Sequence, residues 1–368
     1  MSSVNAGAGL GISGLDRHVR LALTALTALI SLALAGTLGG CTYLGNGKDG
    51  QKEPEKLEFD LSSLGIKKGS TGPLETPPPG LEKKATAWSE IGSKYEKLGM
   101  FDYAEKCYLK CTELSPSDKF YWHSLANARK NQNKFEGSRQ AFIKSLDYDV
   151  NDIYTMAAIA FADAQLVKDV EARYYLLTAL SVRPDFQEAW RGLYALAHRI
   201  AEDKYMPQLG RLRNSPGEGF NRCFAQSMIA AYLNDHRPED EFYWGYQVSS
   251  GYFLMNDRKY AEAESTLKKV IAAKPGSWEA LRAKVGLTTL YTRIGRDDEA
   301  LSLIAELEKE SPKQPFIWFN KALVTRRQGD LNTAIEYLGK ATSLAPDHGS
   351  WGKLFGEWME EERKAAKS

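Results

Sequence analysis

The sequence lacks most features that mark an enzyme or a disulfide-stabilised fold. Four cysteines in 368 residues, Cys41, Cys107, Cys111 and Cys223, are too few for a disulfide scaffold and lack the CxxC spacing of a zinc site. The net charge is only +1, so no global basic surface indicates nucleic-acid binding. HExxH, GxxxxGK[ST] and GxSxG motifs are absent. The sequence therefore predicts no catalysis, no cofactor, no metal and no small-molecule substrate.

A long apolar run lies near the beginning of the chain. Arg17, His18 and Arg20 precede residues 21–35, a low-polarity stretch long enough for the hydrophobic core of a signal peptide. A permanent signal-anchor helix over residues 21–40 is the alternative, because about twenty apolar residues can cross a bilayer. Glycines at the end of the run favour cleavage.

The sequence Leu38-Gly39-Gly40-Cys41 follows this run and resembles the bacterial lipobox. The resemblance implies a cleaved signal peptide, a lipidated Cys41 carrying acyl chains such as palmitate, and export across the inner membrane. Several acyl chains hold a protein on a membrane where a single chain is marginal. Thr42 stands where inner-membrane lipoproteins typically have aspartate. We therefore expect attachment to the inner leaflet of the outer membrane, facing the periplasm.

Residues 41–84 are rich in Gly, Pro, Lys and Glu, which predicts a flexible tether after the lipidated cysteine. A more apolar stretch within it, residues 57–66, is predicted to be either inert linker or a docking segment.

A pattern of 34 residues repeats from residue 85 onward. The first unit has the full set: Trp88, Ile91, Gly92, Tyr95, Ala104, Tyr108, Cys111 and Pro116. Equivalent residues recur 34 and 68 positions later, and the pattern resumes from Gly251 to Pro346. This spacing resembles the tetratricopeptide repeat, abbreviated TPR.

The resemblance implies an all-α fold, a right-handed superhelical solenoid of antiparallel helix pairs. Small residues at three positions of each unit let the helices approach closely, and proline ends the second helix. A single pair cannot bury its apolar face alone, so stacking of neighbours supplies the core.

The middle of the chain departs from the pattern. The distance from Pro184 to Pro275 is 91 residues, which is neither two nor three repeats, and an extra helix around residues 220–233 is predicted to form a joint between two repeat blocks. The predicted organisation is signal peptide 1–40, tether 41–84, TPR block one 85–200, irregular joint 201–243, TPR block two 244–348 and capping helix 349–368.

Family resemblance also implies where a partner would bind, because the first helix of each TPR unit lines the concave face. Mapping the lining positions onto this chain gives a groove rich in aromatic and basic residues: Phe120, His123, Asn127, Lys130, Tyr154, Phe161, Arg191, Tyr252, Arg282, Arg293, Phe316, Phe319, Arg326 and Arg327. Such a groove suits a protein or peptide with acidic groups or a free C-terminal carboxylate. Asn127 and Lys130 resemble part of a carboxylate clamp.

The expected function is that of a lipid-anchored scaffold or adaptor in an envelope assembly, similar to pilotins or to adaptors of peptidoglycan enzymes and secretion complexes. A non-catalytic accessory subunit of an envelope enzyme or of a polysaccharide-export complex is the alternative. An enzyme hidden in the irregular middle, using Glu202, Asp203, Asp235 and His236, is a third possibility that surface charges explain better. Cys107 and Cys111, one helical turn apart, are expected to be buried inert thiols rather than a disulfide or a metal site.

Overall fold

The computed structural model describes residues 75–199, 218–346 and 348–365. Residues 1–40, Cys41 and the tether up to residue 74 lie outside this part, as do residues 200–217 of the joint. Every regular element in the described ranges is a helix: α2 Ala85–Lys97, α3 Phe101–Leu114, α4 Lys119–Lys130, α5 Phe135–Leu146, α6 Ile153–Gln165, α7 Asp169–Val182, α8 Gln187–Arg199, α9 Glu218–Asp235, α10 Tyr243–Asn256, α11 Tyr260–Ala273, α12 Trp278–Ile294, α13 Asp297–Glu310, α14 Pro315–Arg327, α15 Leu331–Leu344 and α16 Gly349–Ala365.

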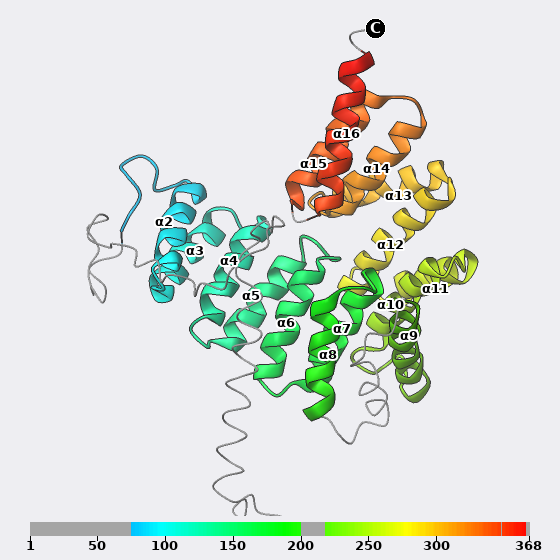
Figure 1. Ribbon diagram of the computed structural model, residues 1–368, viewed down its shortest axis with the longest axis horizontal. Coiled ribbons are helices and arrows are strands. Elements are labelled where there is room, and N and C mark those ends of the chain that lie inside the picture. Colours follow the sequence, from blue (N-terminus) through cyan, green and yellow to red (C-terminus); the bar gives the residue numbers. More distant parts are fainter. Residues whose placement is uncertain (1–74, 200–217, 347, 366–368) are drawn as a thin grey trace, which may run out of the picture. The chain divides into compact units, whose positions relative to one another are not determined.

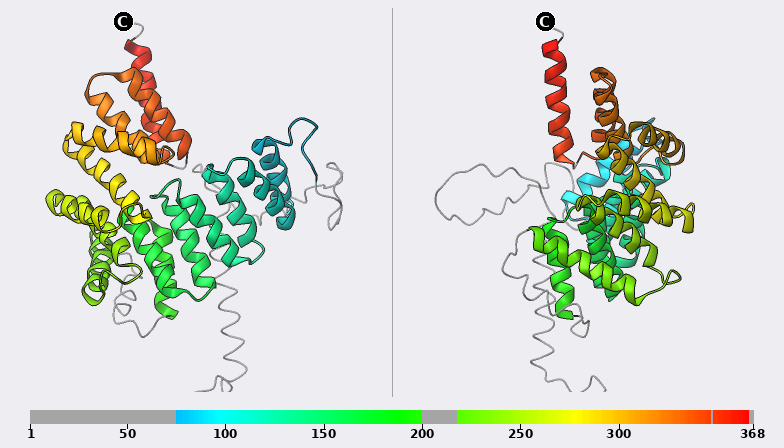
Figure 2. Two further views of the ribbon diagram at one scale, coloured as in Figure 1. Left: turned by 180° about the vertical axis from the view of Figure 1, so that it is seen from behind. Right: turned by 90° about the vertical axis from the view of Figure 1, so that its right-hand side faces the viewer.

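These helices stack as pairs. The connection within each pair is so short that the two helices must run antiparallel; α2 and α3, for example, are separated by residues 98–100. Pairs follow one another side by side from α2 to α7 (Figures 1 and 2). The predicted all-α array of antiparallel TPR-type pairs is therefore confirmed.

Small residues lie where the helices approach most closely, as the pattern predicts. Ala104, Ala172, Ala300 and Ala334 are completely buried between neighbouring helices. Gly92 is an extreme case, because a Cβ atom there would lie 2.9 Å from the Tyr108 ring. Such contacts explain why these positions accept so little side-chain volume.

Four tryptophans share one polar contact that ties a helix to the loop before it. The indole Nε1 of Trp88, Trp122, Trp190 and Trp318 each donates a hydrogen bond to the backbone carbonyl six residues earlier, at 2.6–2.8 Å. In three of the four units that carbonyl belongs to the proline that ends the preceding helix. The tryptophan thus fills the groove and also satisfies a carbonyl that the helix end leaves without a partner.

The turn inside each pair contains one residue in the left-handed region. Gly99, Asn133 and Val167 occupy this position in the first three pairs, with φ of 71°, 59° and 60°. Glycine and asparagine tolerate this conformation, but a β-branched valine is strained there. Val167 is also 74% exposed, so its side chain contributes little packing.

We therefore expect Val167→Asn to stabilise the chain by about 1 kcal/mol, since it relieves the strain without loss of buried surface. The reciprocal change Asn133→Val should destabilise the chain by a similar amount. Chemical denaturation of both variants checks this expectation, and an unchanged or lower stability of Val167→Asn would show that the turn stores no strain.

At the joint, α10 packs directly on α7, and α9 packs on both. The predicted extra helix around residues 220–233 corresponds to α9. Tyr174 of α7 lies in an aromatic cluster with Phe242, Tyr246 and the neighbouring Tyr175, at ring-centroid distances of 4.7, 5.2 and 5.2 Å. The second block therefore continues from the third helix pair through a cluster of aromatic rings.

The end of the predicted tether is ordered rather than flexible. The backbone N–H of Glu75 donates to the Tyr95 hydroxyl at 2.9 Å, Pro77 is buried, and the carbonyl of Glu82 accepts the Trp88 bond. The prediction of a flexible segment is thus wrong for residues 75–84. These residues contact Tyr95 and Trp88 on α2, the first helix in the described part of the chain.

Candidate partner-binding surface

The predicted groove residues differ widely in exposure. Phe120 and Tyr154 are 37% and 40% exposed, which is unusual for large apolar side chains in this chain. Arg191 and Arg293 are also exposed, although Arg293 donates a long 3.4 Å hydrogen bond to the Met255 carbonyl. These four residues remain available to a partner.

Tyr252 and Arg282 do not line an open surface, contrary to prediction. Tyr252 is 6% exposed and Arg282 is fully buried. The Arg282 guanidinium of α12 donates to Ser249 Oγ of α10 at 3.2 Å and to Ser181 Oγ of α7 at 2.8 Å. Because α10 packs on α7, the face of α12 that would have lined a groove is instead used to fasten the two blocks together.

In the last unit, helix α16 covers the predicted groove. Phe319 stacks on Trp351 of α16 with ring centroids 4.5 Å apart, and Phe316 meets the same ring edge-on at 4.9 Å. Arg326 is ion-paired with Glu361 of α16, and Arg327 is ion-paired with Asp297 of α13. The expectation of an open surface is therefore wrong for Phe316, Phe319 and Arg326, which α16 engages, whereas Arg327 is exposed but ion-paired with α13.

The remaining groove residues of block one are half-buried. His123 Nδ1 lies 3.3 Å from Thr155 Oγ1, and Phe161 packs edge-on against Phe135. Burial lowers the pKa of Lys130, with the nearby Glu96 carboxylate opposing the shift. Asn127 lies one helical turn before Lys130 on α4. No described contact tests whether the Asn127–Lys130 pair holds a carboxylate.

Phe120 and Tyr154 hold equivalent positions, at the second residue of α4 and of α6. Asp118 and Asp152 cap these helices by accepting the backbone N–H of Phe120 and Tyr154 at 3.0 and 3.1 Å. Arg183 lies 5.4 Å from the centre of the Tyr154 ring. We refer to Phe120, Tyr154 and Arg183 as the aromatic face. Sequence reasoning missed Arg183, because it lies in a loop after α7 rather than on a first helix.

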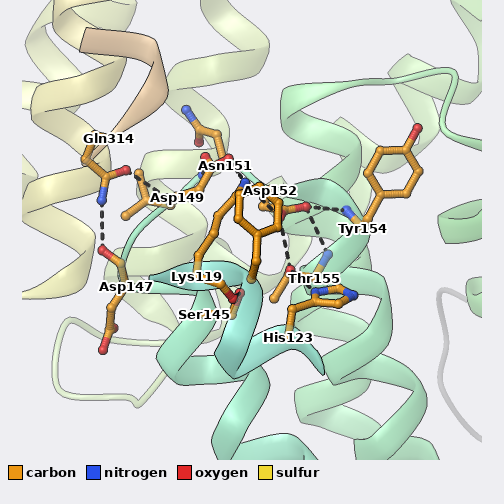
Figure 3. A network of polar contacts seen from close by, with 12 residues as sticks. Lys119, His123, Ser145, Asp147, Asp149, Asn151, Asp152, Tyr154, Thr155 and Gln314 are labelled. Atoms are coloured by element: carbon orange, nitrogen blue, oxygen red, sulfur yellow. Dashed lines mark hydrogen bonds and ion pairs between the residues drawn. The ribbon is translucent and has the colours of Figure 1, made fainter. Parts of the chain in front are cut away.

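Beneath this face is a buried ionic network (Figure 3). Lys119 is 8% exposed, and its Nζ lies 3.0 Å from Asp149 and 3.5 Å from Asp152. Burial raises the pKa of Asp149 to about 6, with the Asp152 carboxylate adding to the shift and the Lys119 ammonium opposing it. Two carboxylates share one cation, and this arrangement fixes the start of α6 and so the position of Tyr154.

A second buried carboxylate gives a testable pH dependence. Asp163 is fully buried beside Arg139, and burial raises its pKa to about 6. A raised folded-state pKa means that the folded chain binds the proton more tightly than the unfolded chain does. The stability that this group contributes is therefore present at low pH and is lost as the pH rises towards 6.

The free energy of unfolding of the native chain, compared with that of Asp163→Asn, should fall by on the order of 1 kcal/mol between pH 4.5 and 7. Urea denaturation at both pH values checks this difference, and Asp102→Asn, at an exposed position of α3, is the control for loss of charge. An equal difference at the two pH values would contradict the prediction.

Cys107 and Cys111 are buried and unbonded to each other, as expected for inert thiols. Burial raises their pKa values to about 11 and about 12. Cys111 Sγ also lies 3.2 Å from the carbonyl of Ala85, so it packs as a small core residue. A thiolate is the reactive form of cysteine, and such pKa values disfavour it.

The irregular middle contains a small cavity of about 60 Å³ between α7, α9 and α10, lined by Arg173, Leu177, Met228, Tyr232, Asp235, His236 and Tyr246. His236 stacks on Tyr232 with ring centroids 3.7 Å apart, and its Nδ1 lies 2.9 Å from the Tyr232 carbonyl. Glu202 and Asp203 lie outside the described residues. Within the described ranges no three His, Cys, Asp or Glu side chains gather as metal ligands, and no helix is both long and apolar enough to cross a bilayer.

The helix pairs at both ends of the array match known repeat families. Residues 85–118 and 317–348 match one tetratricopeptide repeat family, and residues 254–318 match another. The chain contains tetratricopeptide repeats. The matched segments cover α2 and α3 in block one and α11 to α15 in block two.

Several known proteins are similar to this chain. A TPR repeat-containing protein of Pseudomonas aeruginosa is 29% identical over 180 residues, which are 48% of this chain and 26% of that protein. A human protein O-mannosyl-transferase is 21% identical over 301 residues, 63% of this chain and 32% of its own length. The chain thus spans about a quarter to a third of the length of these relatives. A tetratricopeptide repeat protein from Parabacteroides merdae with a known crystal structure is 16% identical in sequence. The structural alignment has a TM-score of 0.37 and covers 75% of this chain and 98% of that protein.

Proposed function

We infer that this TPR chain is a non-catalytic scaffold that binds a protein partner through the aromatic face. The observation that carries the proposal is the exposure of Phe120 and Tyr154, the two exposed aromatic side chains among the described residues, at equivalent positions of consecutive first helices. Aromatic rings bring much contact area at little entropic cost, and they are frequent anchors of protein interfaces.

The partner that we propose carries acidic groups or a free C-terminal carboxylate near an apolar residue. Arg183 lies against Tyr154, and Arg191 is exposed on α8, the next first helix. A guanidinium can hold a carboxylate by two parallel hydrogen bonds while the aromatic ring receives the apolar side chain. This proposal is narrower than the groove expected from the sequence, because Arg282 is buried and Arg326 and Arg327 are ion-paired. The ion pair of Arg183 with Asp185, in contrast, is long, at 3.9 Å.

We further propose that Cys41 anchors the chain in the inner leaflet of the outer membrane, where it takes part in an envelope assembly. The support is the sequence alone, namely the apolar run and the Leu38-Gly39-Gly40-Cys41 segment. Cys41→Ser should abolish labelling by an alkyne-tagged fatty acid and shift the chain to the soluble fraction. Equal labelling of the native and Cys41→Ser chains would exclude this anchor.

A photo-crosslinking residue at position 120 or 154, placed in the full chain in its native host, tests the aromatic face. We expect both positions to capture the same discrete protein. Position 110, an exposed lysine on the second helix α3, is the control and should not capture it. Failure of both test positions, or equal capture from position 110, would reject the aromatic face as the partner site.

A further inference from the structure

One connection between helix pairs is built differently from the others. Helix α5 has 12 residues, whereas α3, α7, α11 and α13 each have 14. The connections after those four helices have proline as their second residue, but the α5–α6 connection, residues 147–152, has the sequence DYDVND. Helix α5 therefore ends about half a turn early, and residues 147–152 form turns in which the Asp149 and Asp152 N–H groups donate to the Leu146 and Asp149 carbonyls at 3.2 and 3.1 Å.

This segment reaches block two and is held there by its backbone. The side-chain amide of Gln314, at the start of α14, donates to the Asp147 carbonyl at 2.8 Å and accepts the Val150 N–H at 3.0 Å (Figure 3). Gln314 itself is 2% exposed. One amide that satisfies both a carbonyl and an N–H of this turn recognises its backbone rather than its side chains.

Two side chains of the segment are also recognised. Val150 is fully buried in an apolar pocket formed by Val285, Ile304, Leu307 and Ile317 of α12, α13 and α14. Asn151 donates from Nδ2 to the Tyr252 hydroxyl at 2.9 Å, and that hydroxyl donates to the Arg282 carbonyl at 3.2 Å. Together, Gln314, the valine pocket and Tyr252 form what we call the cradle.

A solenoid of repeats normally makes contacts only between neighbouring units. Here residues 150 and 314 are 164 positions apart and are joined through a buried hydrogen bond. The contact has the elements of peptide recognition: a backbone clamp, an apolar pocket and a polar side-chain contact. It thus differs from the packing of one helix pair on the next.

We propose that the cradle is a peptide-binding site of block two, that residues 147–151 are its built-in occupant, and that a partner turn with a branched apolar residue followed by asparagine can replace them. The occupant includes Asp149 of the ionic network at the start of α6, but the cradle residues all lie in block two, so the proposal does not depend on the function proposed above. A tethered occupant has an effective concentration of about 1 mM, so a partner segment must compete against it. The native chain should therefore bind such a segment more weakly than a chain whose own segment has been disabled.

The test uses a fluorescent peptide with the sequence of residues 146–153 and the full chain. In the variant Val150→Ser/Asn151→Ala the built-in occupant is weakened, and we expect the peptide to bind at least tenfold more tightly than it binds the native chain. Adding Gln314→Ala to that variant should abolish the gain, and a scrambled peptide should not bind. Equal, undetectable binding to both chains would overturn the proposal. Dimerisation of the variant without peptide binding would instead make a second copy the occupant and would also overturn it.

A second measurement keeps the proposal testable if the double variant folds poorly. In the native chain, saturating peptide should displace residues 147–151 and accelerate hydrogen exchange at the Val150 and Asn151 amides. Exchange in α2 and α3, which make no contact with residues 147–151, should stay unchanged. No acceleration at the highest peptide concentration would show that the contact is structural only.

Discussion

Alanine at position 245 is expected to destabilise the chain by about 2 kcal/mol, although glycine in a helix interior normally costs stability relative to alanine. A Cβ atom on Gly245 of α10 would lie 2.1 Å from the Tyr174 hydroxyl and 2.7 Å from two of its ring atoms. Tyr174 is 4% exposed and is surrounded by Tyr175, Phe242 and Tyr246, so the ring has no space to move away. The added methyl group must therefore separate α10 from α7 and weaken the joint between the blocks.

Gly352 offers a matched control for this prediction. It lies in helix α16, and a Cβ atom there would meet nothing within 4 Å. Gly352→Ala should therefore stabilise the chain by up to about 1 kcal/mol, the usual gain from alanine in a helix. Chemical denaturation of both variants gives the comparison. If Gly245→Ala were as stable as the native chain, the close approach of α10 to α7 would be wrong.

A second large effect is expected at Arg282. Burial lowers the pKa of this guanidinium, which donates to the neutral Ser249 and Ser181 hydroxyls and to the Thr178 carbonyl. The rings of Tyr252 and Trp278, at 4.8 and 5.7 Å, give partial compensation by cation–π attraction. Arg282→Lys keeps the buried charge but cannot span the acceptors on α7 and α10, so it should cost about 3 kcal/mol.

Arg282→Met is the informative counterpart. Methionine is unbranched and flexible, although about two atoms shorter than arginine, and it removes the buried charge; replacing buried ions by apolar residues is often neutral or stabilising. We expect Arg282→Met to remain within about 1 kcal/mol of the native chain and to be clearly more stable than Arg282→Lys. Urea denaturation of the two variants decides the point. A methionine variant less stable than the lysine variant would mean that the hydrogen bonds, rather than the charge, dominate at this position.

Much of the fold could be predicted because repeat positions have local causes. Ala104 and Ala334 are small where helices touch, and Trp122 and Trp318 occupy the same position and make the same contact. Each of these features depends on residues within one or two units. Periodicity therefore identified the helix pairs, whereas Phe120 and Tyr154, which are exposed, were selected through the resemblance to the TPR family.

The parts that could not be predicted depend on contacts between distant units. Arg282 has the right position for a groove, but α10 meets α7 at the joint, and this long-range contact buries the guanidinium. Phe319 was expected to be open, and only the return of Trp351 in α16 covers it. No periodicity links Gln314 to Val150, because the contact arises from the shortened α5. Nearest-neighbour reasoning, which suits a regular solenoid, cannot find such contacts.

The most direct test of the central claim, that the aromatic face of block one binds a protein, is hydrogen–deuterium exchange of the full chain with and without the crosslinked partner. The account predicts slower exchange at the first turns of α4 and α6 and around Arg183 when the partner is bound. Protection confined to α14 to α16, with no change in α4 and α6, would contradict it.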